Sequence, residues 1–272
     1  MSLEQLALHN METRFVDNPC RGIVLGANQE GHLVQLAWIM GRSENSQNRI
    51  YVVEDGVVKT KAFDPSKVKD PSLIIYNVMR AHGNVHIVSN GDQTDTIYEN
   101  FDTSEESFSE GFYKALSTRF CEPDQPVFTP RISGYQHFIR AHMSILKANP
   151  FARQPWNEAM ASAEARTPEE KLEIVENKTG MKKDAFPTVR QFFSFPLSPG
   201  YGYCLTTYQP GSKELPSFDG EPFVVPITGA LEDTMQQFWQ ALEPQWRVAL
   251  VGKEMSDGTY RIAEPINKHK VA

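Results

Sequence analysis

Polar side chains that could bind an anion and move protons gather in two stretches of the first half of the chain. Residues 41–51 contain Arg42 and Arg49, and residues 73–97 contain Tyr76. Together the two stretches supply guanidinium groups for an anion, amides and hydroxyls for a polar ring, and carboxylates and a phenol for proton transfer. This combination indicates a phosphorylated heterocycle as the ligand.

Arg42 and Arg49 lie seven residues apart among short or polar residues that favour a loop over a strand. A loop can bring both guanidinium groups to one point, and each can form two parallel charge-assisted hydrogen bonds to a phosphate. The alternative is that both are solvated surface charges paired with Glu44. Taken alone, the two arginines favour that alternative.

Residues 89–96, which run from a serine to a threonine, close an expected strand and lead into an expected helix. Their free backbone N–H groups and hydroxyls could bind a ligand. The same stretch predicts an elaborate turn, with Asn90 and Gly91 supplying positive φ and Thr94 or Asp95 capping the helix. The two interpretations are compatible.

Tyr76 and Asn77 lie inside an apolar strand predicted from Leu73 to Met79, where a phenol and an amide need partners if they are buried. Packing alone could explain the tyrosine. A carboxamide has little reason to be there unless it faces a polar cavity, so Asn77 indicates a functional role.

Other site chemistries have less support. The seven histidines are dispersed and show no metal-ligand spacing, so we expect no bound metal. The glycines match neither a dinucleotide fingerprint nor a P-loop, and no Gly-x-Ser-x-Gly elbow occurs. Cys20 precedes an apolar strand, where a self-cleaving hydrolase would keep its nucleophile, but a buried thiol is the simpler interpretation.

The composition describes an ordinary globular protein. The chain has 272 residues, of which 40% are hydrophobic and 22% charged, and its net charge is −7. The negative charge disfavours nucleic acid and anionic membranes as partners, and no apolar run is long enough to span a bilayer. Three widely spaced cysteines and an N-terminus unlike a signal peptide favour the cytoplasm. We expect one domain.

The elements that would position these side chains begin with three hairpins, predicted over residues 21–40, 51–63 and 73–89. Their runs are apolar on both faces, which is typical of strands between two layers. Thr103 and Glu106 form a capping box ahead of an apolar stripe from Phe108 to Phe120, and Thr167 begins a second helix that Gly180 ends.

Residues 138–183 are therefore expected to be mostly helical. The last third returns to strands, predicted over residues 191–195, 201–208, 246–251 and 259–263, with one intervening helix whose apolar stripe runs from Leu231 to Leu242. Strand-rich halves with covering helices predict an α+β sandwich.

Four motifs occur in an order and spacing that resemble the archaeal-type IMP cyclohydrolase family. They are Arg42-Ser43 followed by Asn48-Arg49, then Tyr76-Asn77, then Ser89-Asn90-Gly91 with Thr94-Asp95-Thr96-Ile97, then Thr129-Pro130-Arg131-Ile132. The resemblance covers residues 19–132 and continues more faintly through residues 203–208 and 246–252. It implies a four-layer αββα sandwich like that of N-terminal-nucleophile hydrolases, without self-processing.

The resemblance also implies a reaction, the closure of 5-formamidoimidazole-4-carboxamide ribotide to inosine monophosphate with loss of water and without a cofactor. The substrate's own carboxamide nitrogen attacks its formyl carbon, so the enzyme mainly holds a near-attack conformer. Proton transfer and oxyanion stabilisation supply the rest.

The motif match further implies roles for individual residues. Arg49 would polarise the formyl oxygen, Tyr76 would donate or relay a proton, and Glu122 would act as general base, unless it is a surface carboxylate near a helix end. The remaining motif side chains would hold the phosphate, the ribose or the imidazole carboxamide: Arg42, Ser43, Asn48, Asn77, Asn90, Gly91, Thr94, Asp95 and Arg131.

The chain departs from the family pattern in three places. The loop between Arg42 and Arg49 is about two residues longer than expected. An N-terminal arm, residues 1–18, precedes the first motif, and the helical stretch 138–183 looks inserted. The insertion could form a lid or an oligomer contact, and we expect a homo-oligomer. An amidohydrolase using Cys20 and a non-catalytic purine nucleotide-binding protein are the alternative functions.

Overall fold

The computed structural model describes residues 1–68, 71, 74–103, 107–211 and 214–270, which form two seven-stranded antiparallel sheets and seven α-helices. Sheet A has the strand order β11-β10-β1-β2-β12-β13, with β14 also paired to β12. Its strands are β1 (Arg21–Ala27), β2 (Leu33–Met40), β10 (Tyr201–Thr206), β11 (Phe223–Pro226), β12 (Arg247–Ser256), β13 (Thr259–Ile262) and β14 (Ile266–Asn267).

Sheet B follows the order of the chain from β3 to β9, so each strand pairs with its neighbour in sequence. Its strands are β3 (Arg49–Glu54), β4 (Val57–Ala62), β5 (Asn77–His82), β6 (Val85–Ser89), β7 (Arg131–His137), β8 (Arg140–Ala148) and β9 (Thr188–Pro196). Sheet A instead joins strands from both ends of the chain, so its residues meet only after long loops have closed.

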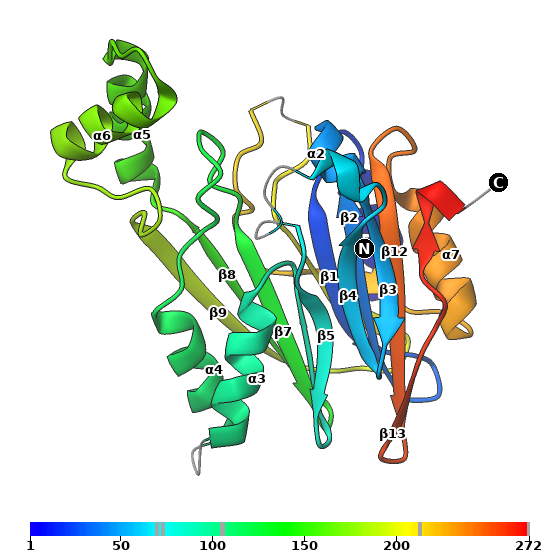
Figure 1. The fold of residues 1–272 in the computed structure, drawn as a ribbon. Helices are drawn as coiled ribbons and strands as arrows, with labels where there is room; N and C mark the ends of the chain where they lie inside the picture. Colours follow the sequence, from blue (N-terminus) through cyan, green and yellow to red (C-terminus); the bar gives the residue numbers. More distant parts are fainter. Residues whose placement is uncertain (69–70, 72–73, 104–106, 212–213, 271–272) are drawn as a thin grey trace.

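The two sheets pack face to face around one apolar core, and helices cover their outer faces (Figure 1). Helices α1 (Leu3–Thr13) and α7 (Leu231–Ala241) lie on sheet A, against β11 and β12. Helices α3 (Gln93–Thr103) and α4 (Phe108–Ser117) lie together on the side of sheet B, where α3 contacts β5 and β6. Burial on both faces explains why β1 and β2 are apolar except at Arg21 and Gln35.

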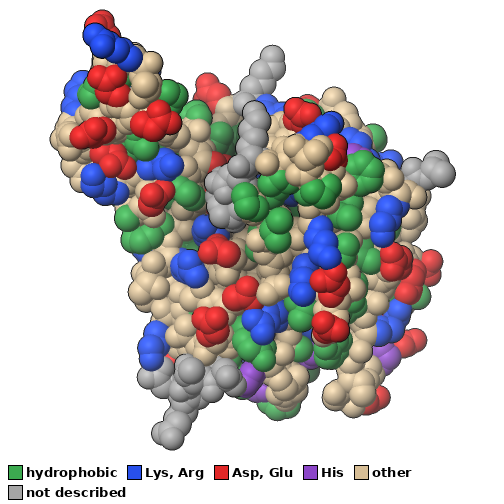
Figure 2. Space-filling model, in the orientation of Figure 1, with side chains coloured by type: hydrophobic (Ala, Val, Ile, Leu, Met, Phe, Trp, Pro, Cys, Tyr) green, Lys and Arg blue, Asp and Glu red, His purple; other side chains and the backbone are tan. Residues whose placement is uncertain are grey.

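Helices α5 (Pro150–Ser162) and α6 (Pro168–Thr179) form a hairpin that projects from the ends of β8 and β9 (Figure 1). Trp156 of α5 and Val175 of α6 are fully buried in a small separate core with Phe128 and Phe186. Charged side chains of both signs cover the visible face of this projection (Figure 2). The described part of the chain also contains the short helix α2 (Glu44–Gln47) and the 3₁₀ turns η1 (Pro65–Lys67) and η3 (Lys268–Lys270).

The predicted hairpins and terminal strands are confirmed, with shifted ends. The third hairpin begins at Asn77 rather than Leu73, a residue outside the described part of the chain. The capping box predicted at Thr103 is wrong, because Thr103 is the last residue of α3; its expected partner Glu106 is not among the described residues. Ser107 caps α4 instead, through reciprocal hydrogen bonds with Glu110.

The helical stretch predicted from Phe138 begins too early, because Arg140–Ala148 forms β8 and pairs with both β7 and β9. Thr167 and Gly180 do bound α6, the glycine with φ of 69°. The N-terminal arm is also structured: it forms α1, and Phe15 behind it is fully buried against Trp38 at a ring distance of 5.3 Å. None of the helices among the described residues is long and apolar enough to cross a bilayer.

Candidate active site

Charged and phenolic side chains are buried between the sheets at the end where β1 begins. Arg21 Nη1 lies 3.3 Å from Glu122 Oε2, and the two side chains are 12% and 5% exposed. Arg49 is 2% exposed and Tyr76 is 8% exposed. The charges of Arg21 and Glu122 alter the pKa of both Arg49 and Tyr76, which places the four groups in one cluster.

The cluster is assembled from strand ends of both sheets and from the loop between α4 and β7. Arg21 begins β1, Arg49 begins β3, and Tyr76 directly precedes β5. In the loop, the backbone N–H of Glu122 donates to the carbonyl of Thr129 at 2.9 Å. Because the positions come from strands that pair with fixed partners, the backbone positions of these side chains are set by the sheets.

Asp124 in the same loop adds a second carboxylate to the cluster. Its Oδ1 accepts the backbone N–H of Thr129 at 2.6 Å, and its Oδ2 accepts the Thr129 hydroxyl, which also lies 2.6 Å from the Tyr208 hydroxyl. Burial, reinforced by the neighbouring charge of Glu122, raises the pKa of Asp124 to about 6. A carboxyl of this kind can exchange a proton near neutral pH.

Tyr76 and Arg49 are hydrogen-bond donors, whereas Asp124 is a proton acceptor. Burial raises the pKa of the Tyr76 phenol, although the charges of Arg49 and Arg21 oppose the effect. Tyr76 therefore stays protonated at neutral pH and can donate a proton. Burial and the charge of Arg21 lower the pKa of Arg49.

Three buried polar atoms of this pair have no hydrogen-bond partner among the described residues: Nε and Nη1 of Arg49 and the hydroxyl of Tyr76. A buried polar group without a partner costs about 1–3 kcal/mol. The Arg49 side chain lies close enough to the Tyr76 phenol to lower its pKa, but no hydrogen bond of good geometry joins the two residues. Buried polar groups in folded proteins are almost always satisfied, so this pair can bind a group that the chain itself does not supply.

A pocket of about 400 Å³ opens in front of the cluster. Arg21, Asp124 and Tyr208 contribute to its wall, and the exposed Arg42 and Ser43 lie at its edge. The other lining residues are Pro19, Met40, Gly41, Ser46, Val127, Thr129 and Leu215. The volume is suitable for a small ligand, and the wall combines cationic, acidic and hydroxyl groups.

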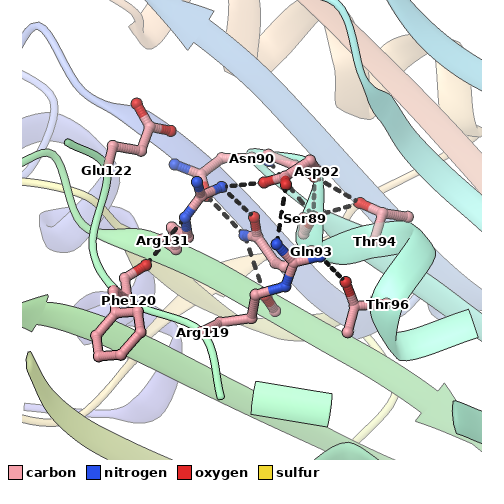
Figure 3. A network of polar contacts seen from close by, with 12 residues as sticks. Ser89, Asn90, Asp92, Gln93, Thr94, Thr96, Arg119, Phe120, Glu122 and Arg131 are labelled. Carbon is pink, nitrogen blue, oxygen red and sulfur yellow. Dashed lines mark hydrogen bonds and ion pairs between the residues drawn. The ribbon is translucent and has the colours of Figure 1, made fainter. Parts of the chain in front are cut away.

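The predicted motif around Asn90 forms a connected network of its own (Figure 3). Asn90 Nδ2 donates to the carbonyl of Pro130 at 3.0 Å, and its Oδ1 accepts the backbone N–H of Ile132 at 2.8 Å. The hydroxyls of Ser89 and Thr94 bond to each other and to the carbonyl of Gly91. Asn90 thus joins the end of β6 to the start of β7, and the hydrogen bonds of these side chains are used within the protein. The predicted turn is wrong in detail, because neither Asn90 nor Gly91 has a positive φ, and Thr94 and Asp95 lie inside α3 instead of capping it.

Arg131 and Arg119 close this network around Asp92, each donating to one of its carboxylate oxygens. Arg131 Nε also donates to the carbonyl of Phe120 at 3.0 Å. Gly91 leaves room for this arrangement, since a β-carbon there would lie 2.7 Å from Arg131 Nη1. Figure 3 shows the Glu122 carboxylate pointing away from the network. Arg131 therefore fixes the loop that carries Glu122 and does not bond to Glu122 itself.

Asn77 and Asp95 lie elsewhere, between β5 and α3. Asn77 Nδ2 donates to both carboxylate oxygens of Asp95, at 2.8 and 3.0 Å, and Arg80 Nη1 donates to Asp95 Oδ1 at 2.6 Å. Asp95 thus explains the carboxamide inside an apolar strand. The polar partner predicted for Asn77 exists, but it belongs to α3.

Asn48 and Ser43 also make local hydrogen bonds. Asn48 is 6% exposed. Its Nδ2 donates to the carbonyl of Asp64 at 2.9 Å, and its Oδ1 accepts the backbone N–H of Asp64 at 2.8 Å. Ser43 caps α2 by accepting the backbone N–H of Ser46. The structure therefore brings Arg49, Tyr76 and Glu122 together, with Arg42 and Ser43 at the pocket edge, and gives the other predicted residues internal partners.

Arg21, Asp124 and Tyr208 were missed by sequence reasoning. Arg21 is a charged residue at the start of an otherwise apolar strand, a signal similar to the one that singled out Asn77. Asp124 follows Glu122 by two residues, and closely spaced carboxylates can shift each other's pKa. Tyr208 lies in the stretch 203–208, where the resemblance is faint, and it joins the cluster through its 2.6 Å contact with Thr129 and through its proximity to Arg21.

Known protein families can now be compared with this geometry. The family model for IMP cyclohydrolase-like protein matches residues 19–259. The chain belongs to that family. The match begins on the pocket wall at Pro19 and covers every strand from β1 to β12, whereas α1 lies outside it. No curated protein matches the chain.

Cys20 has none of the features of an activated nucleophile. Its thiol is fully buried, and burial raises its pKa to about 12, although a contact with Trp38 opposes the effect. The thiol therefore remains protonated at neutral pH. Within the described ranges, no three His, Cys, Asp or Glu side chains are arranged so that they could hold a metal ion.

Proposed function

We propose that this IMP cyclohydrolase-like protein closes the second, six-membered ring on the imidazole of 5-formamidoimidazole-4-carboxamide ribotide, which forms inosine monophosphate and water. The observation that carries the proposal is the set of unpartnered donors on Arg49 and Tyr76, buried beside two carboxylates behind the pocket. The family match supports it. The face-to-face sheets with outer helices support an αββα sandwich like that of N-terminal-nucleophile hydrolases.

In the first step, the substrate's carboxamide nitrogen attacks its formyl carbon, and negative charge develops on the formyl oxygen. Arg49 polarises that oxygen with its free Nε–H and Nη1–H groups, since a preorganised donor acts most strongly on developing charge. Tyr76, whose raised pKa keeps it protonated, donates the proton that converts the oxyanion into a hydroxyl.

The attacking nitrogen must lose a proton, and a carboxylate of the Glu122–Asp124 pair accepts it. Asp124, with its pKa of about 6, is ionised at pH 7 and is still a useful base. Glu122 is held by Arg21, and its charge sustains the pKa of Asp124. The cyclic intermediate then loses its hydroxyl as water and the proton of the former formamide nitrogen, and the new C–N double bond completes the purine.

The ribose monophosphate lies at the pocket edge in this proposal. Arg42 and Ser43 are exposed there, and a guanidinium binds a phosphate through two parallel hydrogen bonds. The reacting arms then point toward Arg21 and Asp124 on the inner wall. The pocket thus orders a phosphate end and a reacting end, as the near-attack geometry requires.

Incubation of the purified protein with the formamido ribotide, followed by ultraviolet absorbance of the hypoxanthine ring, tests the proposal. Arg49→Lys and Tyr76→Phe should each lower kcat by about 10²–10³-fold, because each removes a group aimed at developing charge. Tyr113→Phe, at a half-exposed site on α4, is the matched control and should keep wild-type activity.

Binding of inosine monophosphate by calorimetry separates the remaining possibilities. Binding without any turnover by the wild-type protein would favour the nucleotide-binding alternative. If both variants lost binding and kept the chemical rate, the roles given to Arg49 and Tyr76 would be wrong.

A further inference from the structure

A second polar cluster lies between the sheets at their opposite end. It consists of Gln35 and Lys253 from sheet A and His86 and Gln136 from sheet B, of which His86 is 6% exposed and the others are fully buried. In β1, Arg21 belongs to the active-site cluster and Gly26 bonds to Gln136. Five residue steps along the strand place these two positions roughly 17 Å apart.

Pairing within and between the sheets brings the four side chains to one place. Gln35 is the cross-strand partner of Lys253, and His86 is the partner of Gln136. Gln35 Nε2 donates to the carbonyl of His86 at 2.8 Å, which joins the two pairs across the core. Paired residues point to the same face of a sheet. All four therefore face the space between the sheets.

Each of the four residues carries a buried polar atom without a hydrogen-bond partner among the described residues. Both glutamine amide groups are already donating, Gln35 to His86 and Gln136 to Gly26, so their Oε1 atoms are the unused acceptors. The other two atoms are Nζ of Lys253 and Nδ1 of His86. Burial lowers the pKa of Lys253 to about 7. Four such atoms together are unusual for a native core.

A cavity of about 570 Å³ lies beside the cluster, where the turns of four hairpins meet. His86 belongs both to the cluster and to the cavity wall. Phe138 and Ile139, in the β7–β8 turn, line the same cavity and are 69% and 71% exposed. This end, near β13 in Figure 1, is opposite the end that carries α2.

We propose that this cavity and the cluster behind it form a second binding site, which takes a small planar molecule with a primary carboxamide or lactam edge. The N–H of such a ligand donates to Oε1 of Gln35 or Gln136, and its carbonyl accepts from Lys253 Nζ. The apolar ring lies against Phe138 and Ile139. The polar edge satisfies atoms that the chain leaves unused, and the ring covers apolar surface that the chain leaves exposed.

A carboxylate fits less well than an amide. It offers only acceptors, so both glutamine oxygens would remain without donors, and the cavity rim carries Glu30 and Asp257. A single water could bond to the cluster but would leave Phe138 and Ile139 uncovered. Tyr260 covers the cluster, with Lys253 Nζ 4.1 Å from its ring centroid, and is 42% exposed. Its ring would move to admit the ligand.

Calorimetric titration with nicotinamide and with nicotinate, which differ only in amide against carboxylate, tests the proposal. Nicotinamide should bind at least about tenfold more tightly, and Lys253→Met or Gln136→Met should each weaken it by about tenfold, the effect of one lost hydrogen bond. Lys61→Met and Gln240→Met, at exposed positions, are the matched controls. Thermal unfolding of each variant checks that it is folded.

A crystal soaked with nicotinamide gives the direct readout. Density for the ring beside Phe138 and the amide beside Lys253 is the expected result. Water alone at the cluster, or equal binding of both probes in all variants, would overturn the proposal. The ring-closure assay should be unchanged in Lys253→Met, so failure of this site and failure of the proposed activity can be told apart.

Discussion

Two polar clusters are buried between the same two sheets, one at each end, and they balance charge in different ways. At the pocket end, Arg21 and Glu122 form an ion pair at 3.3 Å, with Arg49 and Asp124 nearby. At the far end, Lys253 is fully buried and has no ion-pair or hydrogen-bond partner among the described residues. Burying a charge is costly unless an opposite charge compensates for it.

The difference shows in the pKa values. The pocket end keeps its charges, because Glu122 holds the pKa of Arg21 above its ordinary value against the opposing effect of burial. The far end loses much of its charge instead, since burial lowers the pKa of Lys253 to about 7, where the amine is half protonated at neutral pH, and that of His86 to about 3. A charged pocket is suited to an ionic substrate, and a nearly neutral one to a neutral ligand.

The largest effect is expected from breaking the ion pair at the pocket end. Arg21→Met leaves the Glu122 carboxylate buried without its partner, which should lower the free energy of unfolding by about 3–5 kcal/mol. Urea unfolding monitored by circular dichroism measures the loss. Arg166→Met, at an exposed position, is the control and should change stability by less than about 0.5 kcal/mol. An equal loss of stability in both variants would mean that the buried ion pair contributes no more than a surface arginine.

Removing the charge at the far end should have the opposite sign. Lys253→Met replaces an unpaired buried amine by an apolar side chain of similar length and should raise the free energy of unfolding by about 1–4 kcal/mol. The gain depends on pH. The folded-state pKa of Lys253, about 7, lies below its ordinary value of 10.5, so between these values the unfolded chain binds more protons.

The free energy of unfolding of the wild-type protein should therefore rise with pH between about 7 and 10.5, as Lys253 loses its proton. Below pH 7 the protonated amine destabilises the folded state to its full extent. The advantage of Lys253→Met should be largest at pH 6–7 and should shrink as the pH approaches 10. Thermal unfolding of both proteins across this range measures the difference. A constant advantage at every pH would mean that Lys253 is paired in solution and that the two clusters are alike.

A smaller effect is expected in the pH profile of the proposed reaction. Asp124, with a pKa of about 6, should lose its function as a base when it is protonated, so kcat/KM should fall about fivefold from pH 6 to pH 5. In Asp124→Asn, kcat/KM should be low and should no longer fall between pH 6 and pH 5. If this fall persists in Asp124→Asn and disappears in Glu122→Gln, Glu122 is the base.

The sequence predicts the elements more completely than the site. Alternating apolar runs and turn residues locate most strands, because burial between two layers leaves a local pattern. The strand β8 was missed, since its pairing with β7 and β9 is not visible in local sequence. Motif order singled out Arg49, Tyr76 and Glu122, which the structure places in one cluster. It could not separate them from Asn90 and Asn77, whose polar atoms are used by partners distant in sequence.

The smallest expected effect tests that separation. Asn77→Ala removes two hydrogen bonds to Asp95 outside both clusters and should lower the free energy of unfolding by about 1 kcal/mol, because Arg80 still binds the carboxylate. Asp95→Asn, which weakens the bond from Arg80, should have a similar effect. Neither change should alter KM for the ribotide, since Asn77 bonds to α3 rather than lining the pocket. A rise in KM of about tenfold with unchanged stability would mean that Asn77 binds substrate, and the active site would then extend through sheet B.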